Sequence, residues 1–272
     1  MAHAPLTGAG FHRRYIMFYP NTLVGTFLSR PNRFLAHVMV GGHEVVCHVK
    51  NTGRLKELLI PGTEVIVQHH PDAAAAGRKT EYLLIGVSKP ETTAGDAAAS
   101  ATGVALDSLQ PAHTWVNIDS QAPNQAAYEW LTTGEGLPFC PRPQNVRREV
   151  RWDQSRFDLA FTDCGKPWFM EVKGVTLDVN GTAMFPDAPT ERGIKHLDEL
   201  GLAVKEGYGA AVLFVIQMKG ISAFAPHRER HPEFADALIR AKNNGVHVWA
   251  YDCIVTENSM KIDAPVKVML DR

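Results

Sequence analysis

The chain has 272 residues, of which 45% are hydrophobic and 21% are charged. These proportions are typical of a globular protein with a substantial apolar core, and they exclude a disordered or fibrous chain. The formal net charge is −1, so binding to nucleic acid would require positive charge to be gathered on one part of the surface.

The sequence carries no signal for secretion or for membrane insertion. Residues 1–10 lack a basic start followed by an apolar run, so we expect no signal peptide. No apolar stretch reaches the roughly 18 residues of a membrane span, and the expected location is the cytoplasm. The cysteines are scattered and predict buried thiols, without a disulfide framework or a zinc site: Cys47, Cys140, Cys164 and Cys253.

The first third of the chain has the pattern of a small β-barrel. Gly41-Gly42 lies between two strand-like segments and predicts a hairpin, and Pro61-Gly62 ends a short helical segment at residues 54–59. The predicted strands are 23–29, 33–40, 43–49, 63–69 and 82–88. Three strands, a short helix and two strands are the order of the OB-fold, which binds oligonucleotides or oligosaccharides. Another small barrel with no nucleic-acid role gives the same pattern.

Two segments have the composition of loops. Residues 73–76 are alanines between the fourth and fifth predicted strands, and residues 91–103 are rich in Ala, Thr, Gly and Ser. The longer segment predicts a linker. We therefore expect an OB-like domain at 1–95 and a second domain at 104–272.

The second domain alternates between helices and strands. A helix at 125–131 precedes strands at 146–152, 157–162 and 168–175, and Asn180-Gly181 turns a short return strand. The remaining predicted elements are a helix capped by Thr190, a strand at 210–218, a helix opened by Pro232 and a strand at 246–255. The fold class is therefore α/β (α+β), with a mixed sheet flanked by helices.

Three residues of this sheet form a pattern typical of metal-dependent nucleases. Asp158 opens the second strand, and Glu171 and Lys173 share one face of the third because they are two residues apart. Two acids facing inward are costly unless a cation compensates them, and their oxygens suit Mg²⁺ or Mn²⁺, with the Val172 carbonyl as a third ligand. Such a cation activates water and holds phosphate, while Lys173 orients the water or stabilises negative charge.

With the order helix, three strands, helix, strand, this pattern predicts a PD-(D/E)XK, restriction-endonuclease-like domain. The catalytic candidates are Asp158, Glu171 and Lys173. The alternative is an exposed strand whose acids and lysine form surface ion pairs of about 1 kcal/mol or less. Glu149, on the first strand, is either a supporting ligand of a metal or a solvated partner of Arg147 or Arg151.

The segment from Phe185 to Gly193 leads into the long helix. Free backbone N–H groups at the helix start, near Thr190, attract anions, whereas Arg192 and Lys195 in the first turns oppose the helix dipole. A bound phosphate or a nearby acid would explain both cations. Asp187 either supports the site or pairs with Arg192, and His196 either lies near the site or only packs.

The OB-like domain has basic residues at its strand ends and loops. With Phe34 nearby they predict a grip on a nucleic-acid backbone, although a solvated basic rim would have the same pattern. The candidates are Arg30, Arg33, Lys50, Asn51 and Arg54, to which Arg156, Thr190 and Lys195 of the second domain are added.

Several longer segments make the chain resemble the sugar fermentation stimulation protein A family over most of its length. They are Arg30-Pro31-Asn32-Arg33-Phe34, residues 48–55, Ser155-Arg156-Phe157-Asp158, residues 171–177 and residues 185–193. The resemblance implies an N-terminal OB-like domain, a C-terminal PD-(D/E)XK domain, DNA binding and a link to sugar metabolism.

Three functions remain open at this point. The first is a DNA-binding protein with a Mg²⁺-dependent nuclease centre. The second is a DNA-binding regulator that retains the nuclease fold without catalysis, and the third is an OB-domain protein that binds oligosaccharides. DNA is the expected partner, single- or double-stranded, and a homodimer remains open.

Overall fold

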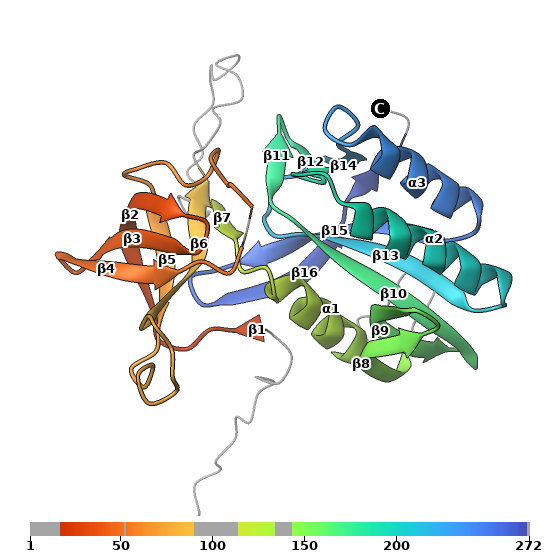
Figure 1. The fold of residues 1–272 in the computed structure, drawn as a ribbon, viewed down its shortest axis with the longest axis horizontal. Helices are drawn as coiled ribbons and strands as arrows, with labels where there is room; N and C mark the ends of the chain where they lie inside the picture. The colour runs from red at the N-terminus through yellow and green to blue at the C-terminus, as the bar shows by residue number, and fades with distance from the viewer. Residues whose placement is uncertain (1–16, 52, 90–113, 134–142, 271–272) are drawn as a thin grey trace, which may run out of the picture.

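The protein consists of a β-barrel and a larger sheet covered by helices (Figure 1). The structure, a computed structural model, describes residues 17–51, 53–89, 114–133 and 143–270. The predicted linker at 91–103 and Cys140 lie outside these residues. Within them, no helix is long and apolar enough to cross a membrane.

The barrel has the predicted OB-fold order. Its sheet runs β4-β3-β2-β5-β6, and a parallel pairing of β4 with β6 closes it through Cys47 with Tyr82 and His48 with Leu83. The strands are β2 Thr22–Asn32, β3 Leu35–Val40, β4 His43–His48, β5 Glu64–His69 and β6 Tyr82–Lys89. A further strand, β7 Thr114–Asn117, follows the predicted linker and pairs with β6.

The short helix predicted at residues 54–59 is wrong. Only one turn forms, in which the N–H of Leu59 donates to the carbonyl of Leu55 at 2.9 Å. Leu55 has a φ of 48°, in the left-handed region, so a right-handed helix cannot run through it. The apolar residues of this turn still face inward, because Leu55, Leu58 and Leu59 are buried.

The second lobe is built on a seven-stranded mixed sheet in the order β1-β16-β15-β13-β10-β9-β8. Strands β10, β13 and β15 are parallel, and the outer strands are antiparallel. All eight residues of β13 are buried, as predicted for a strand covered on both faces. The strands are β1 Met17–Phe18, β8 Gln144–Trp152, β9 Ser155–Asp163, β10 Lys166–Val175, β13 Gly209–Ile216, β15 His247–Val255 and β16 Ser259–Pro265.

Helices cover both faces of this sheet. Helix α1 Ala122–Thr133 lies on one face, and α2 Glu191–Lys205 and α3 Pro232–Asn243 lie on the other (Figure 1). Thr190 caps α2 as predicted, since its Oγ1 accepts a hydrogen bond from the N–H of Gly193 at 3.1 Å. The predicted turn at Asn180-Gly181 also forms, with φ angles of 52° and 79°.

A second, smaller sheet lies beyond the end of β10. It runs β11-β12-β14-β17 and was predicted only in part, because its strands have two to four residues each. Periodicity is hard to detect in such short segments. The strands are β11 Leu177–Val179, β12 Thr182–Phe185, β14 Ala223–Pro226 and β17 Lys267–Val268.

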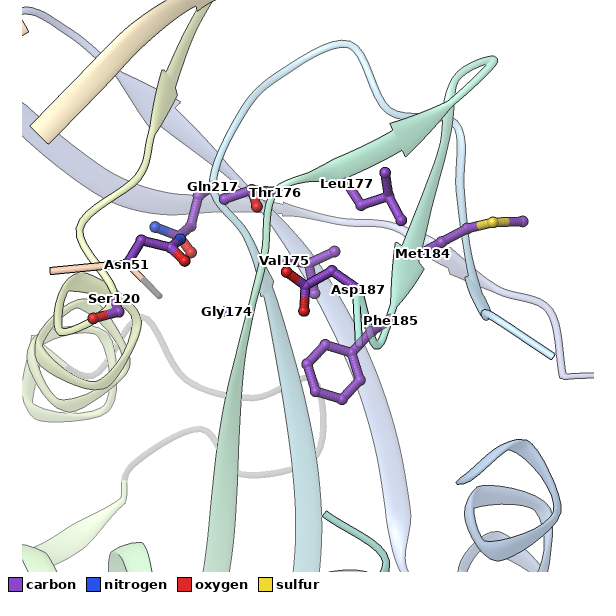
Figure 2. A pocket seen from close by; sticks show the side chains of 10 residues that line it. All are labelled: Asn51, Ser120, Gly174, Val175, Thr176, Leu177, Met184, Phe185, Asp187 and Gln217. Carbon is purple, nitrogen blue, oxygen red and sulfur yellow. The ribbon is translucent and has the colours of Figure 1, made fainter. Parts of the chain in front are cut away.

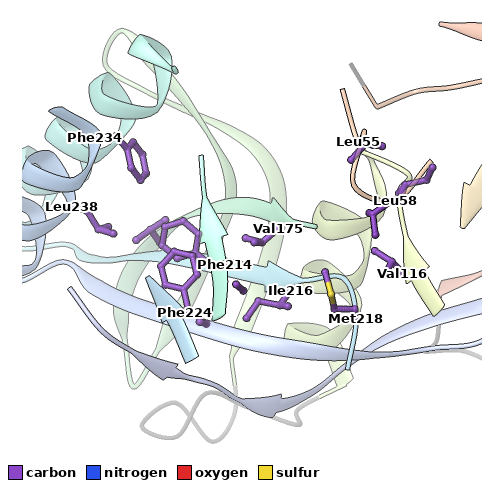
Figure 3. Close-up of a cluster of buried hydrophobic side chains, with 14 of the residues drawn as sticks. Leu55, Leu58, Val116, Val175, Phe214, Ile216, Met218, Phe224, Phe234 and Leu238 are labelled. Carbon is purple, nitrogen blue, oxygen red and sulfur yellow. The ribbon is translucent and has the colours of Figure 1, made fainter. Parts of the chain in front are cut away.

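Apolar and polar contacts join the two lobes where β10 ends. One continuous apolar cluster includes Leu55, Leu58 and Val116 from the barrel side and Met218, which follows β13, from the second lobe (Figure 3). Beside it, Gln217 Nε2 donates to the carbonyl of Asn117 at 2.9 Å, and the N–H of Asn117 donates back to the carbonyl of Gln217 at 3.0 Å. The lobes are therefore held by shared core as well as by hydrogen bonds.

Phe214 at the centre of this core provides a test of the packing. Its ring is fully buried and stacks on Phe224 at 4.0 Å (Figure 3). Phe214→Ala should lower the free energy of unfolding by about 3–5 kcal/mol, because a cavity replaces the ring. Urea denaturation measures this, with Leu202→Ala at a position 48% exposed as the control, for which a change of about 0.5 kcal/mol is expected. Equal effects would contradict the packing.

Candidate active site

Asp158 lies where β9 separates from β10. The backbone ladder between these strands ends at Leu159 opposite Met170. One residue further, a side chain replaces the backbone as hydrogen-bond acceptor. Oδ2 of Asp158 accepts a hydrogen bond from the N–H of Val172 at 2.8 Å. Its other oxygen, Oδ1, accepts from Asn124 Nδ2 in the first turn of α1 at 2.7 Å. The carboxylate of Asp158 thereby links α1, β9 and β10.

Glu171 is the most deeply buried acid of this site, with 3% of its surface exposed. Its Oε1 accepts a hydrogen bond from Lys173 Nζ at 2.7 Å and contacts Nδ1 of His196 on α2. The other oxygen, Oε2, is buried without a hydrogen-bond partner among the described residues. Buried oxygens are almost always satisfied, so this one is available to a ligand.

The alternation along β10 places the acid and the lysine as predicted. Met170 and Val172 are buried in the apolar cluster beneath α1. Glu171 and Lys173 face the opposite side, where α2 supplies His196. This geometry does not fit the alternative of exposed surface pairs, because the side chains of Glu171 and Lys173 are only 4% and 15% exposed.

Arg192 extends the contacts of this site to the surface. Its Nε donates to Nε2 of His196 at 3.4 Å. An Nε2 that accepts leaves the ring proton on Nδ1, which then donates to Glu171. Arg192, His196 and Glu171 therefore form a chain of hydrogen bonds that holds one carboxylate oxygen and leaves the other unpartnered.

The two carboxylates have pKa values shifted in opposite directions. Burial, with the nearby charge of Glu171, raises the pKa of Asp158 above its ordinary value. Burial alone would also raise the pKa of Glu171, but the hydrogen bond from His196 and the charge of Lys173 bring that pKa below its ordinary value. The charged form of Glu171 is therefore stabilised by its neighbours, whereas that of Asp158 is disfavoured by burial and by the charge of Glu171.

The site fits a hard divalent cation better than a softer metal. Within the described residues, no three or more His, Cys, Asp or Glu side chains are grouped to hold a metal ion. Asp158 and Glu171 supply oxygens, and the unpartnered Oε2 of Glu171 is the donor that a cation would use. Two carboxylates with water completing the shell is the coordination that Mg²⁺ prefers. The carbonyl of Val172 remains a predicted third ligand.

The other predicted supporting residues differ in position. Glu149 is exposed and pairs with Arg156 at 3.3 Å, in agreement with the solvated alternative, although with a different arginine. Arg192 reaches Glu171 through His196, as described above, and has no ion pair with Asp187 among the contacts of the described chain. Asp187 is exposed and lines a pocket instead.

That pocket lies directly after Lys173, at the joint of the two lobes (Figure 2). It has a volume of about 160 Å³. Asn51 and Ser120 line it from the barrel side, and Asp187 and the β10 end line it from the sheet (Figure 2). Gly174 has to be glycine, since a Cβ would lie 2.6 Å from Gln217 Oε1 and from Pro123.

The start of α2 carries two further candidates. Thr190 uses its hydroxyl to cap the helix, and its N–H donates to Nδ1 of His231 at 3.3 Å. Lys195 is exposed and pairs with Glu199 at 3.6 Å. Lys195 therefore has a nearby acid as its partner, which is the alternative to a bound phosphate at the start of α2.

Arg30 organises the loop that faces the second lobe. Its Nη1 donates to the carbonyls of Gly53 and Arg54 at 2.8 and 3.0 Å. Its Nη2 donates to the carbonyls of Arg33 and Asn51 at 2.8 and 2.7 Å. These bonds occupy both Nη groups of the guanidinium, so Arg30 shapes the loop.

The remaining barrel candidates divide into tethered and exposed residues. Lys50 pairs with buried Asp119 at 2.9 Å, and Asn51 Oδ1 accepts from the N–H of Gly53 at 2.8 Å. Arg33 and Arg54 are exposed. Together with Lys56 they line a groove of about 490 Å³, so positive charge does gather on this side of the barrel.

Sequence reasoning missed Asn124 and left His196 undecided. Asn124 follows Pro123 at a helix start, and a polar residue there gives no sign that it contacts an acid on another strand. His196 lies on the buried face of α2, where a packing role gives the same pattern. Only the tertiary structure brings both residues to the two carboxylates.

The role of Arg30 can be separated from that of its neighbour. Arg30→Gln should lower the free energy of unfolding by roughly 1.5–3 kcal/mol, because four carbonyls lose a charged donor. Arg33→Gln is the matched control and should change it by about 0.5 kcal/mol, since Arg33 is exposed. Chemical denaturation measures both, and an unchanged stability of Arg30→Gln would show that the loop does not depend on it.

The pKa shifts lead to a test in metal-free protein. A carbon-13 NMR titration should place the pKa of Asp158 above 3.8 and that of Glu171 below 4.5. The folded state disfavours the charged form of Asp158, and this raises the pKa of Asp158. Asp158 therefore contributes stability at low pH that is lost as pH rises through its folded pKa. Glu171→Gln should lower the pKa of Asp158 by removing a neighbouring charge, whereas Glu257→Gln, exposed and distant, should not. An Asp158 pKa unchanged by Glu171→Gln would contradict the coupling.

Comparison with known proteins gives relatives over most of the chain. A sugar fermentation stimulation protein homolog of Clostridium beijerinckii is 46% identical over 254 residues, which is 93% of this chain and 100% of the relative. A homolog of Desulfitobacterium hafniense is 45% identical, over 93% of this chain and 99% of its own length.

Solved structures and family models agree with these relatives. The structure of Pyrococcus furiosus SfsA in complex with Ca²⁺ matches with a TM-score of 0.74 and 25% identity, covering 94% of this chain and 99% of the other. The family model of the SfsA N-terminal OB domain matches residues 28–95, and that of the sugar fermentation stimulation protein RE domain matches residues 121–259. The chain therefore belongs to the sugar fermentation stimulation protein family.

Proposed function

We propose that this protein binds nucleic acid, with DNA as the expected partner, and hydrolyses its phosphodiester bonds at a divalent-metal centre formed by Asp158 and Glu171. Mg²⁺ or Mn²⁺ is the expected cofactor. The observation that carries the proposal is the buried Oε2 of Glu171, which has no hydrogen-bond partner in the described part of the chain and lies near a second carboxylate whose pKa is raised. Without a cation, such an arrangement places excess negative charge in a region of low polarity.

A cation held by Asp158 and Glu171 would polarise a phosphate oxygen and lower the pKa of a bound water. The residues of the chain supply the rest. Asn124 and the N–H of Val172 fix both oxygens of Asp158. His196 and Lys173 fix Oε1 of Glu171. Rigid donors of this kind reduce the reorganisation needed during the reaction.

Lys173 is suited to act on the substrate side. Its ammonium group is held 2.7 Å from Glu171 and is partly exposed. In that position it can donate to the scissile phosphate or to a water, and so stabilise negative charge that develops there. The pocket beyond Gly174 would then accommodate part of the substrate next to Lys173.

The relatives support a metal at this fold. The Pyrococcus furiosus protein, which shares the fold over nearly its whole length, is described in complex with Ca²⁺. Ca²⁺ and Mg²⁺ both prefer oxygen ligands. The two family models are named an RE domain and an OB domain. Both names support nucleic acid as the substrate, since OB-folds bind oligonucleotides.

Cleavage assays test the proposal. Plasmid and single-stranded DNA are incubated with the protein while Mg²⁺ or Mn²⁺ is titrated. Glu171→Gln and Lys173→Ala should each lower the cleavage rate by about 100-fold or more. Glu257→Gln is the matched control and should cut as the wild type does, because its side chain is exposed on the turn between β15 and β16.

Binding of the metal is measured separately from cutting. Mn²⁺ at about 100 times its Kd should stabilise the wild type by roughly 2.7 kcal/mol in thermal denaturation. Lys173→Ala should keep this stabilisation, and Glu171→Gln should lose most of it. Metal binding and DNA binding without any cleavage would instead identify a non-catalytic regulator.

A further inference from the structure

A further cavity lies on the barrel, separate from the groove at Arg33 and Arg54 and from the two carboxylates. Its volume is about 590 Å³, within the range of ligand sites. Leu35, Tyr82 and Leu83 line it from the strands, and Phe34 lines it from the β2–β3 turn. Arg78 and Lys79, from the connection between β5 and β6, complete the rim. We call this cavity the Phe34 pocket.

The aromatic groups of the pocket are placed for stacking. Phe34 is 46% exposed, so its ring is accessible to a ligand in the pocket. The guanidinium of Arg33 lies over that ring, 4.9 Å from its centroid. Tyr82 is held by a stack on His69, with ring centroids 4.7 Å apart and planes 22° apart.

The charge of the rim selects for an anionic ligand. Lys50, Arg78 and Lys79 line the pocket, and none of the described residues that line it is acidic. Arg78 and Lys79 form no ion pair in the part of the chain that the structure describes. Lys50 is partly neutralised by Asp119, so the two unpaired cations belong to the β5–β6 connection.

An apolar, aromatic cavity with a cationic rim matches a nucleotide better than a sugar. A base stacks on aromatic rings, and its phosphates contact the cations. A neutral oligosaccharide would leave those cations without a partner. A duplex keeps its bases stacked and paired, so it offers a base to a pocket only at the cost of unpairing.

The position of the Phe34 pocket relates it to the two carboxylates. Lys50 lines this pocket, and the next residue, Asn51, lines the pocket that also contains Gly174. Gly174 follows Lys173 directly. Adjacent residues of one loop therefore connect the Phe34 pocket with the β10 end.

From these observations we infer that the Phe34 pocket binds an unpaired base of a single-stranded nucleic acid, while Arg78 and Lys79 contact its phosphates. The inference rests on the nucleic-acid binding in the proposed function and names its substrate class. It does not depend on cleavage, and a strand held here would lead toward Lys173.

The test is fluorescence anisotropy with three labelled probes in EDTA, where no metal-dependent cutting occurs. They are a thymidine oligonucleotide of about 12 residues, a hairpin duplex and an abasic strand, all with the same number of phosphates. Wild type should bind the thymidine strand about tenfold more tightly than the abasic strand. Equal binding of these two probes would overturn the inference.

Variants assign the effect to the pocket. Phe34→Ala should weaken binding of the thymidine strand about tenfold and leave the abasic strand unchanged, whereas Phe34→Trp should retain stacking. Val46→Ala, 41% exposed on the same barrel and outside the pocket, should bind as wild type. A combined Arg78→Ala and Lys79→Ala variant should weaken all probes and reduce the salt dependence.

Two further outcomes separate this inference from the proposed function. Glu257→Gln should bind all probes like wild type, because Glu257 is exposed on the turn between β15 and β16 and belongs neither to the pocket nor to the two carboxylates. If neither the wild type nor any variant cuts nucleic acid, but the wild type binds the thymidine strand more tightly than the abasic strand, the nuclease proposal fails and this inference stands. If Phe34→Ala binds as Val46→Ala does, or a neutral oligosaccharide displaces the strand, this inference fails whatever the cleavage assays show.

Discussion

The arrangement of the candidate site follows from one requirement, that a carboxylate buried as deeply as Glu171 must be compensated. Lys173 on the same strand supplies a charge, and His196 on α2 supplies a hydrogen bond. Both act on the same oxygen, so the other is left to a ligand. Asp158 adds a second carboxylate, and its burial together with the nearby charge of Glu171 raises its pKa above the ordinary value.

The same strand, β10, also positions the barrel. Where it ends, the N–H of Gln217 donates to the carbonyl of Val175 at 2.9 Å, and Gln217 bonds to Asn117 next to the barrel. Asp119, two residues further along, accepts from Lys50 on the barrel loop. The carboxylates and the barrel surface are thus connected through a short, well-bonded stretch of backbone. In the proposed function, this connection would allow one nucleic-acid strand to contact both.

The sequence predicts most of this architecture because its longer elements have clear periodicity. The strand order of the barrel, the buried run of β13 and the Thr190 cap each depend on local patterns. The single turn at Leu55 was mistaken for a helix, since its apolar spacing is helical and only its left-handed backbone forbids one. His196 and Asn124 could not be assigned, because their partners are 25 and 34 residues away.

Net charge likewise cannot show which charged residues are available for binding, because their ion pairs and hydrogen bonds depend on the tertiary structure. A formal charge of −1 argues against a wholly basic surface, yet it does not say which cations are free. The two Nη groups of Arg30 donate to four carbonyls, and Lys50 pairs with Asp119. Arg78 and Lys79, in contrast, line an apolar pocket. Exposed cations also line the groove formed by Arg33, Arg54 and Lys56, so positive charge is concentrated at particular places on the barrel. In the proposed function, stacking on Phe34, which salt does not screen, would add to the contacts that these cations make with phosphates.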